Sequence, residues 1–309
     1  MKAIKATESL FVKLGPSGSW EESCIKDGTV RLAYKDIPHD LCINGKWDEV
    51  YKLILKDSSN KGAATRHVDQ IRRFYEAPKT ALWFTFSASR VHWCFADSQI
   101  ELLKDGSKVR KTLGGWSDKS LKGEVLDKKN ISGRILATQG FRGTICRGPD
   151  LQYLLNKING VVDPYVVAVQ GAVGNLSKAL IPVIQNLDDR DLETLTDQIF
   201  RQGGWSRIGV LGGTEKDIDL DLISAFSNER IAVQIKSRAN KKIYEDYKKK
   251  FSAMTNYAKF YFVTHSPNSE LEKFRKADAN DDVVEFWDAS KLADHAVKHG
   301  LVGWLLNKF

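Results

Sequence analysis

The stretch GGTEKDIDLDLISAFSNERIAVQIKS, residues 212–237, contains two short segments in which apolar and polar residues alternate. The first covers residues 217–222 and the second covers residues 230–236, and the polar pair Ser227 and Asn228 lies between them. Alternation with a period of two on both sides of a polar turn predicts a β-hairpin.

Strand alternation decides which side chains of this hairpin meet. Asp217, Asp219 and Asp221 share one face of the first segment, and Gln234 and Lys236 share one face of the second. With the turn centred on Ser227 and Asn228, we expect Asp221 opposite Gln234 and Asp219 near Lys236. The hairpin therefore brings carboxylates, an amide oxygen and an ammonium group together.

These side chains suit a hard cation that prefers oxygen ligands. Carboxylates bind Mg²⁺ through a few protein ligands and leave water in its other positions, and the ion activates water for attack on phosphorus. A lysine nearby stabilises the charge that grows on the phosphoryl oxygens. Alternating acids also occur on solvated sheet faces, but a Gln and a Lys on an otherwise apolar strand favour a site, because buried lysine is rare unless paired.

The order Asp221, a gap, and then Gln234-Ile235-Lys236 resembles the PD-(D/E)xK nuclease superfamily. It is similar to the variant found in Mrr-like restriction endonucleases, in which Gln replaces the Glu of the second half of the motif. The resemblance implies hydrolysis of DNA phosphodiester bonds with Mg²⁺, for which Mn²⁺ can substitute, and ends that carry a 5′-phosphate and a 3′-hydroxyl.

The resemblance also implies roles for individual residues. Asp221 would be the main metal ligand, with Asp219 as a helper, or as the true ligand if the hairpin register slips. Gln234 would coordinate through its amide oxygen or position the water, and Lys236 would stabilise the transition state. Glu193, next to the apolar stripe of the helix expected after residue 188, would complete the metal shell. Because Gln is uncharged, we expect weaker metal binding than Glu would give.

The residues around the hairpin fit the α/β core of this superfamily, a mixed sheet flanked by helices. We expect a first helix over 188–202, strands over 205–211 and in the hairpin, a helix over 243–253, and an apolar parallel strand over 259–265. A further helix, strand and two helices follow. The expected nuclease domain covers residues 188–309.

Residues 1–150 read as a separate α+β domain that is β-rich, with a curved sheet or a small barrel. Aromatic and β-branched runs between Gly, Asn and Asp clusters predict strands over residues 28–34, 81–86, 90–96 and 133–138. One helix is expected between Gly62 and Tyr75, where apolar side chains recur on one face.

This first domain is the candidate for DNA recognition. Cationic loops neutralise phosphates, and aromatic faces between them stack on bases or enclose a flipped, modified cytosine. The candidate DNA contacts are Trp116, Lys108, Arg110, Lys111 and Arg142, together with Arg238 in the nuclease domain. The alternative is that the aromatic residues form the core and the cations lie in solvated loops.

Residues 151–187 are expected to be a helical connector. A short helix ends at Gly160, and an apolar helical pattern follows Pro164. Polar residues interrupt that pattern, which favours a helix packed between the domains over a membrane span.

Composition agrees with a nucleic-acid partner, since the 309 residues carry a net charge of +8. The four cysteines lack metal-site spacing and the N-terminus lacks an apolar signal segment, so we expect a cytoplasmic protein. No phosphate-binding or dinucleotide motif occurs, so no nucleotide cofactor is expected. No uninterrupted apolar run of about 18 or more residues occurs, so a membrane is not expected either.

These observations predict a Mg²⁺-dependent endonuclease of restriction type that cleaves double-stranded DNA after recognition of a sequence or a modified base. Two alternatives stay open: a catalytically inactive DNA-binding protein, and a structure-selective nuclease for repair or junctions. Cleavage of both strands needs two active sites, so we expect a homodimer.

Overall fold

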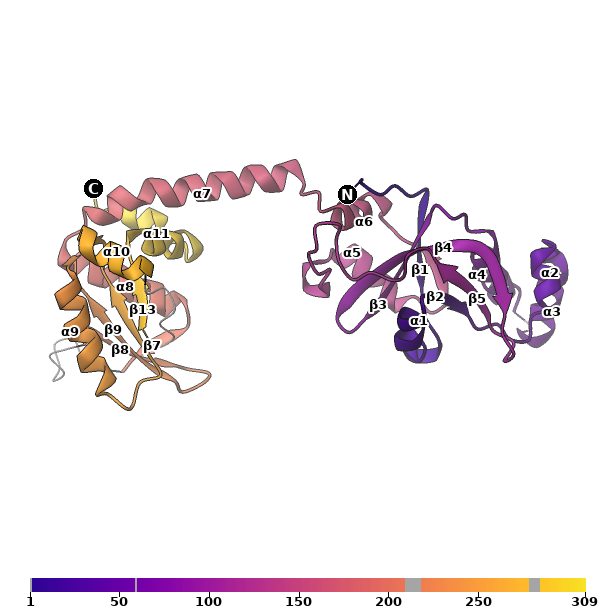
Figure 1. Ribbon diagram of the computed structural model, residues 1–309, viewed down its shortest axis with the longest axis horizontal. Helices are drawn as coiled ribbons and strands as arrows, with labels where there is room; N and C mark the ends of the chain where they lie inside the picture. Colours follow the sequence, from indigo (N-terminus) through magenta and orange to yellow (C-terminus); the bar gives the residue numbers. More distant parts are fainter. Residues whose placement is uncertain (1, 59, 209–217, 278–283) are drawn as a thin grey trace. The chain divides into compact units, whose positions relative to one another are not determined.

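The computed structural model describes residues 2–58, 60–208, 218–277 and 284–309. The chain divides into two compact units, Met1–Asp163 and Pro164–Phe309 (Figure 1). The segment expected as a connector is therefore shared, because α6 (Leu151–Asn159) belongs to the first unit and α7 (Pro164–Gln185) to the second.

The first unit is built on a six-stranded sheet in the order β2-β5-β4-β3-β1-β6. Its strands are β1 (Glu8–Val12), β2 (Thr29–Leu32), β3 (Ala81–Ser87), β4 (Arg90–Leu102), β5 (Lys108–Thr112) and β6 (Ile145–Arg147). The β1/β3 pair is parallel and the other pairs are antiparallel. The sheet has two edges, β2 and β6, so it is open and not a closed barrel.

The long strand β4 bends this sheet. Its first half pairs with β3, its second half pairs with β5, and the register shifts between Ala96 and Ile100. A β-bulge of this kind increases the local twist and turns the strand.

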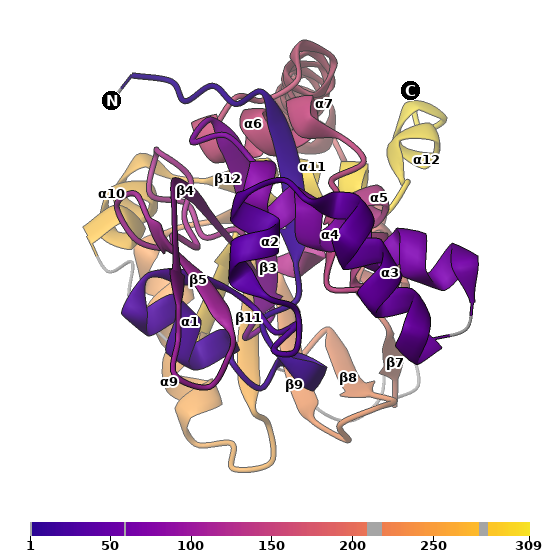
Figure 2. The ribbon, with the colours of Figure 1, turned by 90° about the vertical axis from the view of Figure 1, so that its right-hand side faces the viewer.

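Helices cover both faces of the first sheet. The helices of this unit are α1 (Glu21–Asp27), α2 (His39–Ile43), α3 (Trp47–Ser58), α4 (Lys61–Glu76), α5 (Gly133–Leu136) and α6. Helices α3 and α4 lie side by side (Figure 2) and pack over Leu10 and Trp83, whereas α5 and α6 pack over Phe84 and its neighbours on the other face. The helix expected between Gly62 and Tyr75 is confirmed as α4.

The strand expected over residues 133–138 is wrong. This segment forms α5 and a following 3-10 turn (Ala137–Gly140), because the Ser132 side chain accepts a hydrogen bond from the backbone N–H of Arg134 and caps the helix. A short apolar run does not distinguish a strand from a buried helical turn.

The second unit contains a five-stranded mixed sheet in the order β13-β11-β9-β8-β7. Its strands are β7 (Trp205–Arg207), β8 (Leu220–Ser224), β9 (Arg230–Ile235), β11 (Lys259–Val263) and β13 (Val284–Trp287). The hairpin β8/β9 is antiparallel, and β11 is an interior strand parallel to both of its neighbours, as expected. A separate small pair joins β10 (Arg238–Ala239) to β12 (Ser266–Pro267).

Two layers of helices enclose this sheet. Helix α8 (Asp189–Gln202), α11 (Ala289–Lys298), α12 (Val302–Leu306) and the second half of α7 pack on one face, against Leu222, Val233 and their neighbours. Helices α9 (Lys241–Ser252) and α10 (Ser269–Ala277) pack on the other face, against Phe260 and Phe262. The hairpin thus lies inside a three-layer domain, with its polar side chains on the α9 face.

Candidate active site

The hairpin forms as expected, but its register differs by two residues. Asp221 pairs with Ala232 and Leu220 with Val233, so Asp221 does not lie opposite Gln234. The turn is centred one residue earlier than expected, and Asn228 ends it with a left-handed backbone (φ 56°). Asn tolerates this conformation better than most residues. The register predicted from the sequence is therefore wrong, and it is Asp219 that meets Gln234.

Asp219 is the carboxylate that the hairpin places among the motif residues. Its Oδ2 accepts a hydrogen bond from Gln234 Nε2 and another, of 2.6 Å, from the backbone N–H of Ile235. Burial raises the pKa of the Asp219 carboxyl, although these hydrogen bonds and the nearby Lys236 and Arg207 oppose the shift. Burial outweighs the donors, so a further positive charge at this carboxylate would be stabilising.

Asp221 has a different partner. Its Oδ2 lies 2.6 Å from Nη2 of Arg230, and the Arg230 guanidinium lies over the Tyr257 ring at 5.0 Å from its centroid. The ion pair occupies Oδ2, whereas the buried Oδ1 of Asp221 has no hydrogen-bond partner among the described residues. The geometry contradicts the placement of Asp221 beside Gln234, and its role as a metal ligand stays a prediction. Asp217, the third acid of this alternating set, lies outside the described residues.

Gln234 lies on β9, and Lys236 is the residue directly after this strand, so the two occupy alternate positions along the chain. Gln234 is 1% exposed, and its Oε1 has no hydrogen-bond partner among the described residues. Lys236 is half-buried, with Nζ 5.7 Å from the centroid of the Tyr247 ring. Its charge lowers the pKa of both Asp219 and Glu193, which places the ammonium group within electrostatic reach of the two acids.

Glu193 projects from the first turns of α8 and is exposed. Its pKa is raised, first by burial of the carboxyl and next by the negative charge of Asp219. The two carboxylates thus repel each other, as expected for acids that a cation would bridge.

Arg207, the last residue of β7, is a member of this site that the sequence did not reveal. Its Nη2 donates a 2.8 Å hydrogen bond to the carbonyl oxygen of Asp219, and its charge lowers the pKa of Asp219 and Glu193. The only available signal was a cation in the strand that precedes the acids. Arg207 fixes the backbone at the residue that carries the acid.

The residues present fit a Mg²⁺ ion. Two repelling carboxylates and a buried amide oxygen without a partner supply three hard oxygen ligands, and water normally completes the shell of this ion. Among the described residues, no group of three or more His, Cys, Asp or Glu side chains forms a metal cluster. A metal ion held here would take the amide oxygen of Gln234 as its third protein ligand.

A pocket of about 530 Å³ lies beside Lys236. Its lining residues are Gln185, Asn186, Leu187, Asp189, Lys236, Ser237, Arg238 and His265. The His265 ring is 3% exposed and bonds through Nε2 to the carbonyl oxygen of Leu187 at 3.2 Å. His265 thus holds the segment between α7 and α8 in place, as a structural residue, while the exposed Arg238 brings a cation to the pocket.

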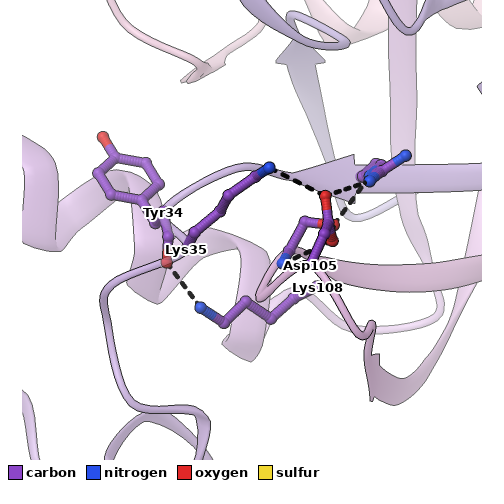
Figure 3. Close-up of polar contacts among 6 residues, drawn as sticks. Tyr34, Lys35, Asp105 and Lys108 are labelled. Carbon is purple, nitrogen blue, oxygen red and sulfur yellow. Dashed lines mark hydrogen bonds and ion pairs between the residues drawn. The ribbon is translucent and has the colours of Figure 1, made fainter.

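Two of the cations expected to contact DNA are buried. Lys108 is 1% exposed, and its Nζ donates to the carbonyl oxygen of Tyr34 at 2.6 Å (Figure 3) and to that of Ile37 at 2.7 Å. Arg110 is fully buried and donates to the carbonyl oxygens of Asp97, Phe74 and Ala77 at 2.6–2.9 Å. The prediction that Lys108 and Arg110 contact DNA is wrong, because their donors bond to backbone carbonyls inside the unit.

The other candidate contacts of the first unit differ among themselves. Trp116 donates its indole N–H to the carbonyl oxygen of Thr29 at 3.0 Å and packs on the core, which does not fit a freely presented stacking face. Lys111 is exposed and lies 2.9 Å from Glu101. Arg142 is also exposed. Of this group, Lys111 and Arg142 stay available to phosphates.

The second unit has a mixed sheet between two helical layers, with an acid, an amide and a lysine on one hairpin. Residues 184–296 match a family model described as a restriction endonuclease. The matched segment includes Glu193, Asp219, Gln234 and Lys236. The C-terminal domain is therefore similar to a restriction endonuclease domain, and this match supports a deoxyribonuclease.

Solved structures with likeness to the chain are also restriction endonucleases. The DNA modification-dependent restriction endonuclease AspBHI has 11% identity and a TM-score of 0.31, with 85% of this chain and 73% of that chain covered. The MspJI restriction endonuclease in complex with a 27-mer oligonucleotide has 10% identity and a TM-score of 0.24, with 79% of this chain and 68% of that chain covered. The restriction endonuclease FokI bound to DNA has 13% identity and a TM-score of 0.28, with 50% of this chain and 33% of that chain covered. The chain therefore spans about a third of that protein. No curated protein matches the chain.

Proposed function

We propose that the protein is a Mg²⁺-dependent endonuclease of restriction type, which hydrolyses phosphodiester bonds of double-stranded DNA after its N-terminal unit has recognised a sequence or a modified base. The observation that carries the proposal is the meeting of Asp219, Gln234 and Lys236 on one hairpin, with the Gln234 Oε1 buried and without a partner among the described residues. This hairpin lies inside the segment that matches a restriction endonuclease family.

Each residue has a defined role in this proposal. Asp219, Gln234 and Glu193 would hold Mg²⁺, which supplies polarisation of the phosphoryl oxygen and activation of water when it is bound. Lys236 orients the attacking water by donating a hydrogen bond to its oxygen, and its charge offsets the negative charge that grows on the phosphoryl oxygens. Arg207 keeps the backbone of Asp219 in place through its hydrogen bond to that carbonyl oxygen.

The proposal assigns DNA binding to exposed cations on both units. Arg238 stands at the pocket beside Lys236, where the strand next to the cleaved bond would pass. Lys111 and Arg142 of the first unit are exposed, and the net charge of +8 favours a polyanion. Because both strands of a duplex must be cut, the proposal includes a homodimer with one active site for each strand.

The test is cleavage of matched plasmids that are unmodified or carry methyl- or hydroxymethylcytosine, with Mg²⁺ or with EDTA. Discrete fragments that appear only with Mg²⁺ are expected, and the preferred plasmid identifies the recognised base. Salt-sensitive binding without any cleavage would indicate a DNA-binding protein. Preferential cutting of branched DNA would indicate a junction nuclease.

Lys236→Ala tests the role assigned to the lysine. Removal of a group that stabilises the transition state should lower the cleavage rate by about 10²–10³-fold. Lys249→Ala is the matched control, since this exposed lysine on α9 changes the net charge by the same amount. Equal single-turnover rates for the two variants would remove Lys236 from the mechanism.

A further inference from the structure

The long helix α7 has two halves with different surroundings. In its second half Ser177, Leu180 and Ile184 are buried, and this half packs along α11. In its first half every residue from Pro164 to Leu176 is exposed. Figure 1 shows that, within the second unit, the first half of α7 extends beyond α11. By length and composition the helix could span a membrane, and only 17% of its most apolar window is buried inside the protein.

The exposed half carries an ordered apolar stripe. Val166, Val169, Val173 and Leu176 follow one another at intervals of three, four and three residues, and they are 46%, 62%, 45% and 39% exposed. This spacing places them along one face, which is the seam pattern of a coiled coil. Below, these four residues are called the α7 seam.

The α7 seam continues a face that is already used for packing. Four residues after Leu176 comes Leu180, which is buried between α7 and α11. The α7 seam therefore continues into the face that packs on α11, and α11 covers only the C-terminal part of this face.

The chemistry of the seam favours a second copy of the same helix. Residues 164–177 contain no charged side chain, so two copies bring no like charges together. Val at positions 166 and 173 and Leu at 176 match the preference of two-stranded coiled coils for β-branched residues at one seam position and Leu at the other. A membrane surface fits less well, because helices that lie on membranes carry Lys and Arg on their polar face.

We propose that the α7 seam is the dimerisation surface of this protein and that it packs against the α7 seam of a second copy of the chain. This inference rests on the homodimer of the proposed function and names its surface. It is independent of the chemistry at Asp219.

The experiment measures mass by sedimentation equilibrium on the full chain over a range of concentrations. The wild type is expected at twice the 34.8 kDa chain mass at about 10 µM. Val169→Glu/Val173→Glu should weaken dimerisation at least about 100-fold, because it buries charges in the seam. The matched control is Ala168→Glu/Asn175→Glu, which adds the same charge to exposed positions on the opposite face and should dimerise like the wild type. Far-UV circular dichroism checks that both variants fold.

Two outcomes would overturn the inference: a monomeric wild type at this concentration, or equal dimerisation by the seam and control variants. A monomer that binds vesicles of phosphatidylcholine and phosphatidylglycerol through the seam would assign this face to a membrane instead. Plasmid cleavage is measured in parallel. A dimer without cleavage contradicts only the proposed chemistry. Cleavage by a monomer contradicts the homodimer and its surface and leaves the proposed chemistry intact.

Discussion

At the scale of single residues, Gln234 distinguishes the candidate site from one that contains only carboxylate ligands. It offers a neutral oxygen where a carboxylate would bind Mg²⁺ more strongly, and its Nε2 donates to the neighbouring Asp219. The amide thus holds the acid in place without adding a second negative charge to a buried site.

Gln234→Glu should therefore lower the stability of the metal-free protein and raise its affinity for Mg²⁺. The new carboxylate lies against Asp219 and removes its donor, so we expect a lower melting temperature without metal and a larger increase on addition of Mg²⁺. The half-saturating Mg²⁺ concentration for cleavage should decrease. Thermal unfolding with and without Mg²⁺ measures the first two effects. An unchanged Mg²⁺ dependence would argue against Gln234 as a ligand.

At this scale the sequence identified the types of residue better than their partners. Gln234 and Lys236 stood out because polar residues on an apolar strand are rare. The choice between Asp219 and Asp221 depended on one residue in the turn, and periodicity does not locate a turn that accurately. Arg207 could not be found, because its hydrogen bond to Asp219 joins strands whose pairing is set by the tertiary fold.

At the scale of elements, the turn of the hairpin determines which acid faces Gln234. Asn228→Val should lower the free energy of unfolding by about 1–2 kcal/mol, because a β-branched residue is strained at positive φ. Asn228→Gly, which accepts this backbone freely, serves as the control and should be neutral or slightly stabilising. Urea unfolding monitors both variants. Equal losses would show that the backbone conformation at this position does not control the hairpin.

Strand β5 places cations inside the first unit. Burial lowers the pKa of Arg110 to about 10, so the guanidinium is still charged at neutral pH. Arg110→Met would leave three carbonyl oxygens without their donor and should cost roughly 3 kcal/mol of stability. Lys111→Met removes the same charge from the exposed side of the strand and should cost little. If Arg110→Met unfolded like the control, these hydrogen bonds would contribute no net stability.

Element prediction succeeded where periodicity was long and failed where it was short. The helices α4, α8 and α9 have apolar stripes over several turns, and the sequence located them. The four-residue helix α5 was taken for a strand, because its apolar run fits either period. Lys108 and Arg110 were expected outside because charge usually means exposure, and backbone carbonyls that satisfy a buried cation leave no mark in the sequence.

At the scale of the whole molecule, partly buried histidines make stability depend on pH. Burial lowers the pKa of His39 and His92 in the first unit and of His265 and His295 in the second. In the unfolded chain these histidines have their ordinary pKa of 6.5, so at pH values near and below 6.5 they bind more protons there than in the folded protein. The free energy of unfolding should decrease as the pH falls through this value, and level off below the folded pKa values.

His295→Phe isolates one contribution to this effect. The His295 ring stacks on Trp287 at a centroid distance of 4.2 Å, and phenylalanine would keep the stack without a titrating group. The loss of stability between about pH 7.5 and pH 5.5 should be smaller in the variant. Urea unfolding at both pH values, with the wild type in parallel, measures it. An identical pH dependence in both proteins would exclude His295 as a contributor.

The second unit was predictable as a whole and the first was not. The order of helices and strands after residue 188 follows local periodicity, and neighbouring strands such as β8 and β9 are joined by a short turn. In the first unit β1 pairs in parallel with β3, about seventy positions later in the chain, and β2 pairs with β5. Such long-range pairings are decided by packing and closure of the sheet.

The short loop between β8 and β9 should tolerate substitutions but not insertions or deletions. Its side chains, such as the 96% exposed Phe226, lie at the surface and contribute little packing. Most amino-acid substitutions in this loop should therefore leave stability and activity nearly unchanged. A single inserted or deleted codon that slides one strand past the other would turn Asp219 to the opposite face of the sheet. In a population under selection against nuclease activity, inactive alleles at this loop should therefore be enriched in small insertions and deletions.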